Sequence, residues 1–224
     1  MWAAPHMDAL YRSEMMEEID FDTWARKEHY AFFMMNDLPF YNVSFNIQVN
    51  GLRSYCKSRA ISLTNTLIYY TVKSLNAIDS FLYRNVGGKI VKYRSLHPSF
   101  SCLREGEELF RLITVDFDSD ILQFDRMVKE EIRQSKKYFD ASRLQGRSDF
   151  VFISSLPWLP FTAIDHTLSL KKEDAIPRVS WGKIIESGGD SYIPFNIRVN
   201  HAFIDGIHVG KFYDELQRHM HSLG

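Results

Sequence analysis

The chain of 224 residues lacks several features that would assign a protein to a class at once. Its two cysteines, Cys56 and Cys102, are too few for a disulfide framework and lack the spacing of a metal site. No apolar run reaches the roughly 20 residues that cross a bilayer. No Gly-rich phosphate loop follows a predicted strand, which disfavours a nucleotide-binding Rossmann or P-loop fold. We therefore expect a cytoplasmic protein without a membrane span.

The chain also carries little net charge. Its 27 Lys and Arg balance 28 Asp and Glu, which gives a formal net charge of −1. This balance argues against a broad surface for nucleic acid or anionic membrane. Aromatic residues are plentiful, at 14% of the chain, and suit a core or pocket built around rings.

No repeat, low-complexity segment or linker rich in Pro, Gly and Ser divides the chain. Residues 1–16 show no clear period, and we expect an N-terminal tail there, either disordered or left over from expression. The tail lacks a basic stretch followed by an apolar one, so we expect no signal peptide. Residues 17–224 are expected to form a single domain, because mixed α/β folds often reach this length.

Hydrophobic periodicity predicts strands and helices without strict βαβ alternation. Alternating or short apolar runs predict strands over 41–49, 110–117, 150–154, 179–185 and 192–199, and a hairpin over 81–93. Helical spacing predicts three helices. The first spans 63–78 with Ser62 or Thr64 as N-cap, the second follows an N-cap at Ser119, and the third begins at about Gly206. Together these elements predict an α+β fold, a two-layer sandwich in which helices cover a mixed, mainly antiparallel sheet.

The strand over 192–199 leads into the best candidate for chemistry. His201 follows the strand, and Asp205 directly precedes the last predicted helix. An imidazole there can act as a general base, but position alone fits a structural histidine and an N-cap aspartate equally well. We expect no metal site of His201, Asp205 and His208, because His208 falls inside the helix.

Four separated segments resemble the chloramphenicol acetyltransferase family. Residues 199–210 resemble its C-terminal signature, His-His-x-x-x-Asp-Gly followed by a helix. Residues 24–30 resemble its Trp-x-Arg-x-Glu-His-Phe segment, residues 96–100 its His-Pro run, and residues 154–158 its Ser-x-x-Pro-Trp segment. The similarity covers nearly everything from Phe21 to His219, with the segments in the family's order.

The resemblance implies roles for the matched residues. His201 matches the catalytic base, and Ser154 matches the serine that hydrogen-bonds the oxyanion of the tetrahedral intermediate. Asp205 matches an aspartate that pairs with an arginine, here Arg26, to support the site without acting as a triad acid. Without the resemblance, Ser154 would be taken for a hydroxyl bonded to backbone and Arg26 for a solvated charge.

Residues 177–183 match the family's segment beside the acyl-transfer site and the phosphates of coenzyme A, so the resemblance implies cofactor binding by Ser180 and Lys183. The chain departs from the family pattern nearer the acceptor. Asn200 replaces the first histidine of the signature, and Phe33, expected to bind substrate, replaces an aromatic residue with a hydroxyl. Phe152 replaces a common asparagine. The acylation machinery is thus better retained than the acceptor pocket.

The resemblance implies an acetyl-CoA-dependent O-acetyltransferase, without a metal, that acts on chloramphenicol or a similar small hydroxylated molecule and contributes to antibiotic resistance. It also implies a homotrimer with active sites between subunits, where one subunit supplies His201 and its neighbour much of the acceptor pocket. Three alternatives remain: an acyltransferase with another hydroxyl or thiol acceptor, the catalytic domain of a dihydrolipoamide acyltransferase, and a non-catalytic protein that binds a small ligand on the same scaffold.

Overall fold

The computed structural model describes residues 15–167 and 171–224. All but the last two residues of the expected tail lie outside this part of the chain. Within it, no helix is long and apolar enough to cross a membrane.

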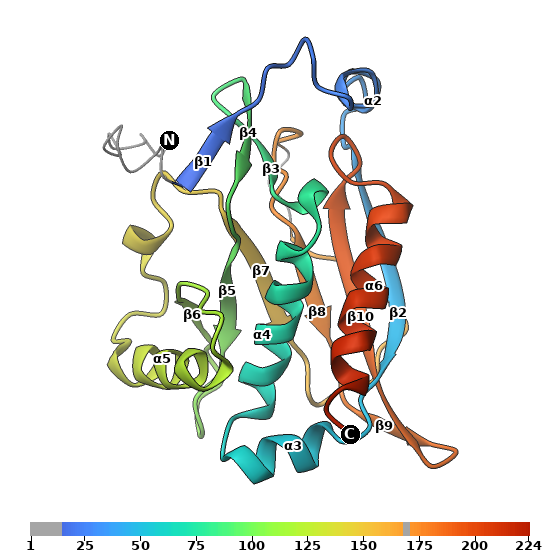
Figure 1. Cartoon of the computed structure of the whole chain (residues 1–224). Coiled ribbons are helices and arrows are strands. Elements are labelled where there is room, and N and C mark those ends of the chain that lie inside the picture. Colours follow the sequence, from blue (N-terminus) through green and yellow to red (C-terminus); the bar gives the residue numbers. More distant parts are fainter. Residues whose placement is uncertain (1–14, 168–170) are drawn as a thin grey trace.

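A main sheet forms one layer of the molecule (Figure 1). Within the described residues its seven strands have the order β2-β10-β8-β7-β5-β6, and β9 also pairs with β10. Their bounds are β2 (Phe40–Gln48), β5 (His97–Cys102), β6 (Arg111–Thr114), β7 (Phe150–Ser155), β8 (Arg178–Trp181), β9 (Ile185–Ser187) and β10 (Asp190–Asn200). β7 runs parallel to β5 and β8, and the other pairings are antiparallel.

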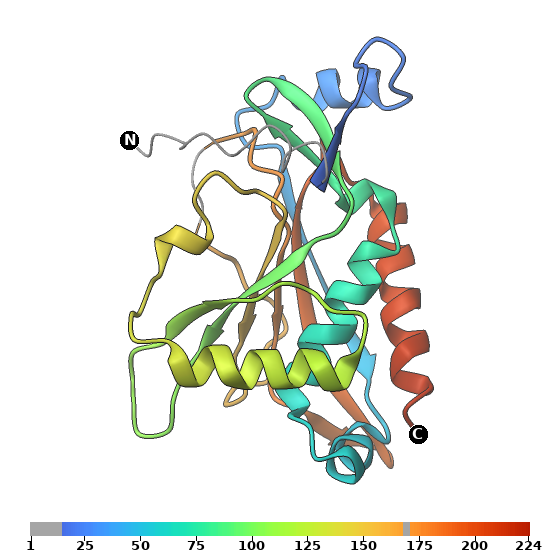
Figure 2. The same ribbon diagram turned by 60° about the vertical axis from the view of Figure 1, so that its left-hand side comes forward.

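Helices form the second layer, and a small antiparallel sheet lies at one end. The helices are α2 (Lys27–Phe33), α3 (Leu52–Arg59), α4 (Leu63–Asn76), α5 (Ile121–Gln134) and α6 (Gly206–His221). The small sheet joins β1 (Met16–Glu18), β4 (Lys89–Tyr93) and β3 (Tyr83–Val86). Two short 3-10 helices span Asp79–Phe81 and Ala141–Arg143. α4 and α6 pack on one face of the main sheet, and α5 lies across its β6 end (Figure 2). The predicted α+β two-layer fold with a mixed, mainly antiparallel sheet is confirmed.

Local chemistry explains where the predicted elements begin and end. Ser62 caps α4, since its Oγ accepts a hydrogen bond from the backbone N–H of Asn65 at 3.3 Å. The expected Ser119 cap of α5 is wrong: Asp120 Oδ1 accepts from the N–H groups of Leu122 and Gln123 at 2.7 and 3.2 Å. Asp120 stands one residue nearer the helix, where its carboxylate reaches these free donors.

Two predicted strands differ in extent. The strand expected over 110–117 is limited to β6, and the run 179–185 is divided into β8 and β9. Gly182 separates the latter two, and a Cβ there would lie only 2.6 Å from the carbonyl oxygen of Leu159. The sheet therefore needs glycine where residues 156–167 pass close to it.

The outer face of the main sheet, turned away from α4 and α6, is also covered. Asn196, Arg198 and Asn200 point to this face of β10, yet each is less than 8% exposed. Residues 156–167 and 171–177 cover them: Arg198 donates to Asp165, and Asn200 Nδ2 donates to the carbonyl oxygens of Lys172 and Asp174. β10 is therefore buried on both faces from Ile193 to Asn200.

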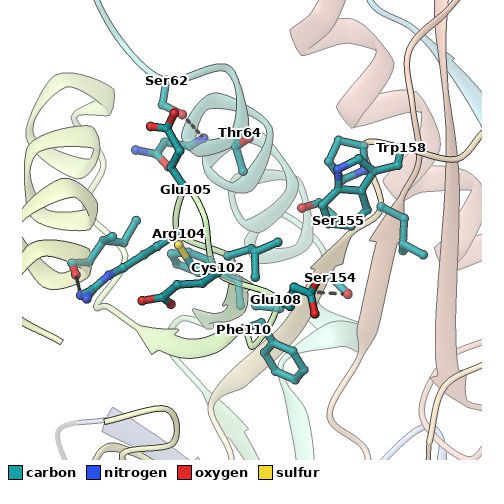
Figure 3. A pocket seen from close by; sticks show the side chains of 18 of the residues that line it. Ser62, Thr64, Cys102, Arg104, Glu105, Glu108, Phe110, Ser154, Ser155 and Trp158 are labelled. Carbon is teal, nitrogen blue, oxygen red and sulfur yellow. Dashed lines mark hydrogen bonds between the residues drawn. The ribbon is translucent and has the colours of Figure 1, made fainter. Parts of the chain in front are cut away.

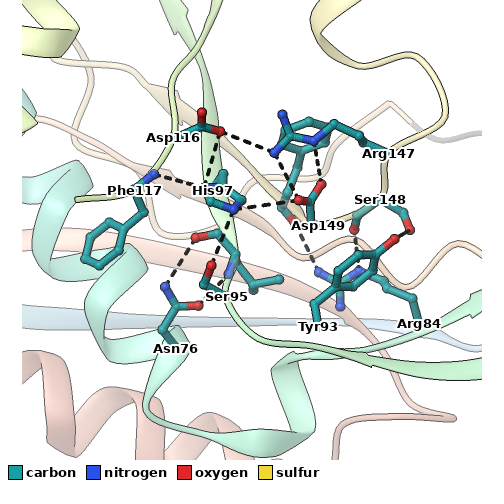
Figure 4. Close-up of polar contacts among 12 residues, drawn as sticks. Asn76, Arg84, Tyr93, Ser95, His97, Asp116, Phe117, Arg147, Ser148 and Asp149 are labelled. Atoms are coloured by element: carbon teal, nitrogen blue, oxygen red, sulfur yellow. Dashed lines mark hydrogen bonds and ion pairs between the residues drawn. The ribbon is translucent and has the colours of Figure 1, made fainter. Parts of the chain in front are cut away.

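A buried polar cluster fastens the start of β5 to its surroundings (Figure 4). The backbone N–H of Phe117 donates to His97 Nδ1 at 2.9 Å, so this nitrogen carries no proton. His97 Nε2 faces Ser95 Oγ at 3.4 Å and Asp149 Oδ2 at 3.7 Å, and Arg147 donates to both oxygens of Asp149. Asp116 Oδ1 lies 3.6 Å from Nδ1, but Nδ1 accepts from Phe117 and has no proton to donate to a carboxylate, so the group lacks the arrangement of a Ser-His-Asp triad. Its contacts are those of a structural anchor.

Candidate active site

His201 lies in the tight turn between β10 and α6, next to α2 (Figure 1). Its ring stacks on Phe33, with centroids 3.8 Å apart and planes inclined by 13°, and Tyr41 approaches with its centroid at 4.6 Å. The buried residues that follow, Ala202, Phe203 and Ile204, fix the turn in the core. The imidazole is therefore held in one orientation while 34% of the side chain stays exposed.

The two nitrogens of His201 have different surroundings. Nδ1 is buried 3.2 Å from Asp205 Oδ1, although it makes no hydrogen bond within the described residues. The nearby carboxylate favours a proton on Nδ1. Because Nδ1 is buried, a hydroxyl from outside can reach only Nε2, whose lone pair is then free to accept a proton.

Arg26 ties the whole turn together. Its Nε and Nη2 donate to the backbone carbonyl oxygens of Ala202 and His201, both at 2.8 Å. Nη1 and Nη2 donate to Oδ2 and Oδ1 of Asp205 at 2.5 and 2.7 Å. This hydrogen bonding lowers the pKa of Asp205, so the carboxylate stays ionised beside the imidazole. Four bonds from one guanidinium thus join the start of α2 to the turn that carries His201.

Three other polar residues around His201 have structural contacts: Asn200, Tyr41 and His208. Asn200 Oδ1 accepts from the N–H of Ala202 at 2.9 Å, and the Tyr41 hydroxyl donates to the carbonyl of Ile204 at 3.2 Å. His208 Nδ1 accepts from the N–H of Asp205 at 2.9 Å, which occupies it at the start of α6. Within the described part of the chain, no group of three or more His, Cys, Asp or Glu side chains is arranged to hold a metal ion.

Ser154 lies near the end of β7 and lines a cavity of about 730 Å³ (Figure 3). Its Oγ is 3.3 Å from Ser101 Oγ on β5. The cavity is bounded by the start of α4, by the turn between β5 and β6, and by residues 154–158. Phe110 and Trp158 add largely exposed rings to its wall.

His201 and Ser154 stand near opposite ends of the sheet. Ser154 pairs with Ser180, which pairs with Asn196, so these three lie in one line across β7, β8 and β10. Asn200 is four residues further along β10, about 13 Å, and two strands away, about 10 Å. Its Cα is therefore about 16 Å from that of Ser154. The two side chains of one chain cannot act on the same atom.

The other expected site residues are divided between these places. Phe33 and Arg26 join His201. Ser180 is fully buried one strand from Ser154, and His166 Nε2 lies 3.3 Å from its hydroxyl. Lys183 is exposed just after β8. Sequence reasoning missed Tyr41 and His166: Tyr41 was assigned only to a strand, and His166 stands in a stretch without periodicity.

Solved structures show which class of protein has this fold. A chloramphenicol acetyltransferase superposes with a TM-score of 0.84 at 23% identity, covering 92% of this chain and 100% of that one. A probable dihydrolipoamide acetyltransferase from Listeria monocytogenes superposes with a TM-score of 0.62 at 12% identity, covering 93% and 95%. The fold is therefore one shared by acyltransferases.

The sequence narrows this class. A model of the family described as chloramphenicol acetyltransferase matches residues 15–217, and the chain belongs to that family. Curated chloramphenicol acetyltransferases include one from Clostridium perfringens, 26% identical over 201 residues, and one from Campylobacter coli, 27% identical over 202. The alignments cover 89% of this chain and 92% and 96% of those proteins. The chain is thus an acyltransferase enzyme, and its membership supports acetyl-CoA as co-substrate.

Proposed function

We propose that the chain transfers an acetyl group from acetyl-CoA to a hydroxyl of chloramphenicol or a similar small molecule, with His201 as general base. The observation that carries the proposal is the state of the His201 ring: Nδ1 is buried 3.2 Å from a carboxylate, and the ring is stacked on Phe33. Such an imidazole presents an unprotonated Nε2 in one direction, as a base that meets a hydroxyl must.

In the proposed reaction, Nε2 takes the proton of the acceptor hydroxyl while its oxygen attacks the thioester carbonyl. The Ser154 hydroxyl donates a hydrogen bond to the oxyanion that forms. One preorganised donor of this kind typically lowers the barrier by about 3–4 kcal/mol. When the intermediate collapses, the C–S bond breaks and the coenzyme leaves as a thiolate. His201 gives this thiolate the proton that it took from the hydroxyl, and the acetyl ester remains on the acceptor.

Asp205 acts in this scheme as support. Arg26 donates hydrogen bonds to both oxygens of Asp205 and to the backbone of the turn, so the pair fixes where His201 stands. The ionised carboxylate also favours the Nδ1-protonated ring. Lys183, exposed beyond β8, suits the phosphates of coenzyme A, and Ser180 flanks the position of the acyl group one strand from Ser154.

We propose a homotrimer in which His201 of one subunit meets Ser154 of the next. Two observations support it. The Cα of Asn200, directly before His201, is about 16 Å from that of Ser154, so His201 and Ser154 of one chain are too far apart to act on the same atom. Exposed apolar side chains also lie at both ends of the sheet, as a head-to-tail ring would require. They are Phe32, Met35 and Leu38 near His201, and Leu109, Phe110 and Trp158 near Ser154.

The acceptor region departs from the family pattern at Phe33. Phe33 forms the stacking surface at His201 and offers no hydroxyl to a substrate. A different hydroxylated or thiol acceptor is therefore the first alternative. A non-catalytic protein that binds a small ligand is the second, and the reading as a dihydrolipoamide acyltransferase domain finds support in the fold alone.

A thiol-release assay tests the proposal. The protein is incubated with acetyl-CoA and with chloramphenicol, other hydroxylated aromatics or a dithiol. We expect turnover with at least one hydroxyl acceptor, and a loss of at least about 10³-fold in His201→Ala with an unchanged circular dichroism spectrum. Turnover with the dithiol only would favour the thiol alternative, and binding without turnover would favour the non-catalytic one. Expression in a chloramphenicol-sensitive bacterium tests the proposed cytoplasmic resistance role.

A further inference from the structure

Five short polar side chains lie in register across the outer face of the main sheet. Ser154 pairs with Ser180, Ser180 with Asn196, and Asn196 with Ser44. Ser101 continues the row, since its Oγ lies 3.3 Å from Ser154 Oγ. Residues paired across neighbouring strands point to the same face. The row thus runs from Ser101 on β5 to Ser44 on β2 and contains the proposed oxyanion serine.

His166 lies over the middle of this row. It is partly exposed, and its Nε2 is 3.3 Å from Ser180 Oγ. Asp165, the residue before it, accepts hydrogen bonds from Asn42 Nδ2 at 3.0 Å and Arg198 Nη1 at 2.5 Å. Two strands of the sheet therefore fix the backbone that carries the imidazole.

Asn196 adds a buried amide to the row. The side chain is 1% exposed, and its Nδ2 donates to Ser44 Oγ at 3.0 Å. Its Oδ1 makes no hydrogen bond within the described residues. A buried amide oxygen without a donor is costly, and a ligand or a water that supplies one is stabilised there. His166 can supply this donor, since hydrogen bonding with the Asn196 side chain is among the effects that raise its pKa.

The charge state of His166 suits the binding of a polar group. Burial lowers its pKa, and the positive charge of Arg178 lowers it further. The imidazole is therefore neutral at pH 7 and both donates and accepts. His201 of the same chain lies near the other end of the sheet, whereas His166 stands about one strand from Ser154.

We propose that His166 determines which acceptors the enzyme prefers. Its imidazole, held on Ser180, binds a second hydroxyl or an amide of the acceptor. This group is distinct from the hydroxyl that receives the acetyl group. This inference rests on the proposed function, because Ser154 marks where the reacting carbonyl would stand. It identifies the acceptor class as small molecules with a second hydrogen-bonding group a few ångströms from the acetylated hydroxyl. Ser180 and Asn196 act as positioning residues beneath the ring.

Two variants and two acceptors test the assignment. His166→Leu keeps the bulk and removes both nitrogens, whereas His166→Asn keeps a polar atom near the position of Nδ1, the nitrogen that does not face Ser180. Chloramphenicol has a second hydroxyl and an amide, whereas 4-nitrobenzyl alcohol has one hydroxyl on a similar ring. We expect His166→Leu to lower the ratio of kcat/KM for chloramphenicol to that for 4-nitrobenzyl alcohol about tenfold, through KM. His166→Asn should recover most of this ratio, and KM for acetyl-CoA should change less than about twofold in both variants.

An unchanged ratio in His166→Leu, or an equal loss in both variants, would overturn the assignment while leaving the proposed function intact. If the wild type acetylates neither acceptor, the proposed function fails for them, and calorimetric titration with chloramphenicol decides the inference. Binding weakened about tenfold in His166→Leu would then support it. Equal binding by wild type and variant, or no binding by either, would overturn it.

Discussion

The ring of His201 lies parallel to the ring of Phe33, with centroids 3.8 Å apart and planes inclined by 13°. Phe33 closes α2, and Arg26 stands immediately before the same helix. One short helix therefore presents both a stacking surface for the imidazole and a guanidinium for the turn behind it. The position of His201 depends on how α2 docks, although 168 residues or more separate the two segments.

Two substitutions of Phe33 test whether its aromatic ring positions the imidazole of His201. Phe33→Leu removes the ring that orients His201, and we expect kcat to fall about tenfold. Phe33→Tyr keeps the ring and should hold kcat within about threefold of the wild type. Steady-state kinetics with saturating acetyl-CoA measure both. A Phe33→Leu variant with the kcat of the wild type would show that the stack does not position the base.

Removing Arg26 should destabilise the protein and inactivate it together. Arg26→Ala leaves the carboxylate of Asp205 and two carbonyl groups without their donor, at a cost of about 3 kcal/mol. For a chain of this size, the melting temperature should fall by about 6–12 °C. Lys27→Ala is the matched control, because its ion pair with Asp22 is exposed and screened by water, so its loss should leave the melting temperature nearly unchanged. Equal melting temperatures for the two variants would contradict the supporting role.

Ser154 should act on the chemical step. Ser154→Ala removes the proposed oxyanion donor, and we expect kcat to fall about 10²–10³-fold with little change in either KM. Ser101→Ala removes only the hydroxyl that lies 3.3 Å from it and should cost less than about tenfold. An equal loss of activity in the two serine variants would contradict a role of Ser154 as donor to the oxyanion.

His97 should make the fold sensitive to acid. Burial lowers its pKa, against the opposing charges of Asp149 and Asp116. The neutral ring is thus favoured in the folded state, and its contribution is complete above the ordinary histidine pKa near 6.5 and is lost as the pH falls through the lower folded value. Protonation of Nδ1 also breaks the hydrogen bond from the Phe117 N–H.

We therefore expect the melting temperature to fall as the pH drops below about 6.5, and to fall less in His97→Asn. The Asn Oδ1 can replace Nδ1 as acceptor without titrating, whereas the oxygen of His97→Gln lies near Nε2, so this control should be less stable at every pH. Melting curves across this range measure the effect. The same pH dependence in wild type and His97→Asn would assign the acid sensitivity to other groups.

Much of the fold could be predicted because its pattern is local. The alternation over 41–49 and the helical spacing over 63–78 correspond to β2 and α4. α3 was missed because only Leu52 and Cys56 of its residues are buried, too few to make a period. β5 was missed because both of its faces are covered over most of its length, which removes alternation.

The site was less predictable because its residues meet through tertiary contacts. The matched motifs brought Arg26, Asp205 and His201 together, and the structure places these three in contact. No sequence period marks Tyr41 as a neighbour of His201, since the two meet only through the pairing of β2 with β10. His166 lies over Ser180 for a similar reason: hydrogen bonds from Asn42 and Arg198 hold the irregular segment before it.

The most direct measurement is complementation between two inactive chains. His201→Ala and Ser154→Ala are expressed together with different tags, and the mixed oligomers are isolated through both tags. In any mixed trimer, one interface of three joins an intact His201 to an intact Ser154, so we predict about one third of the wild-type kcat, with each variant alone inactive. Mixed oligomers as inactive as the separate variants would contradict a site formed by His201 of one subunit and Ser154 of the next.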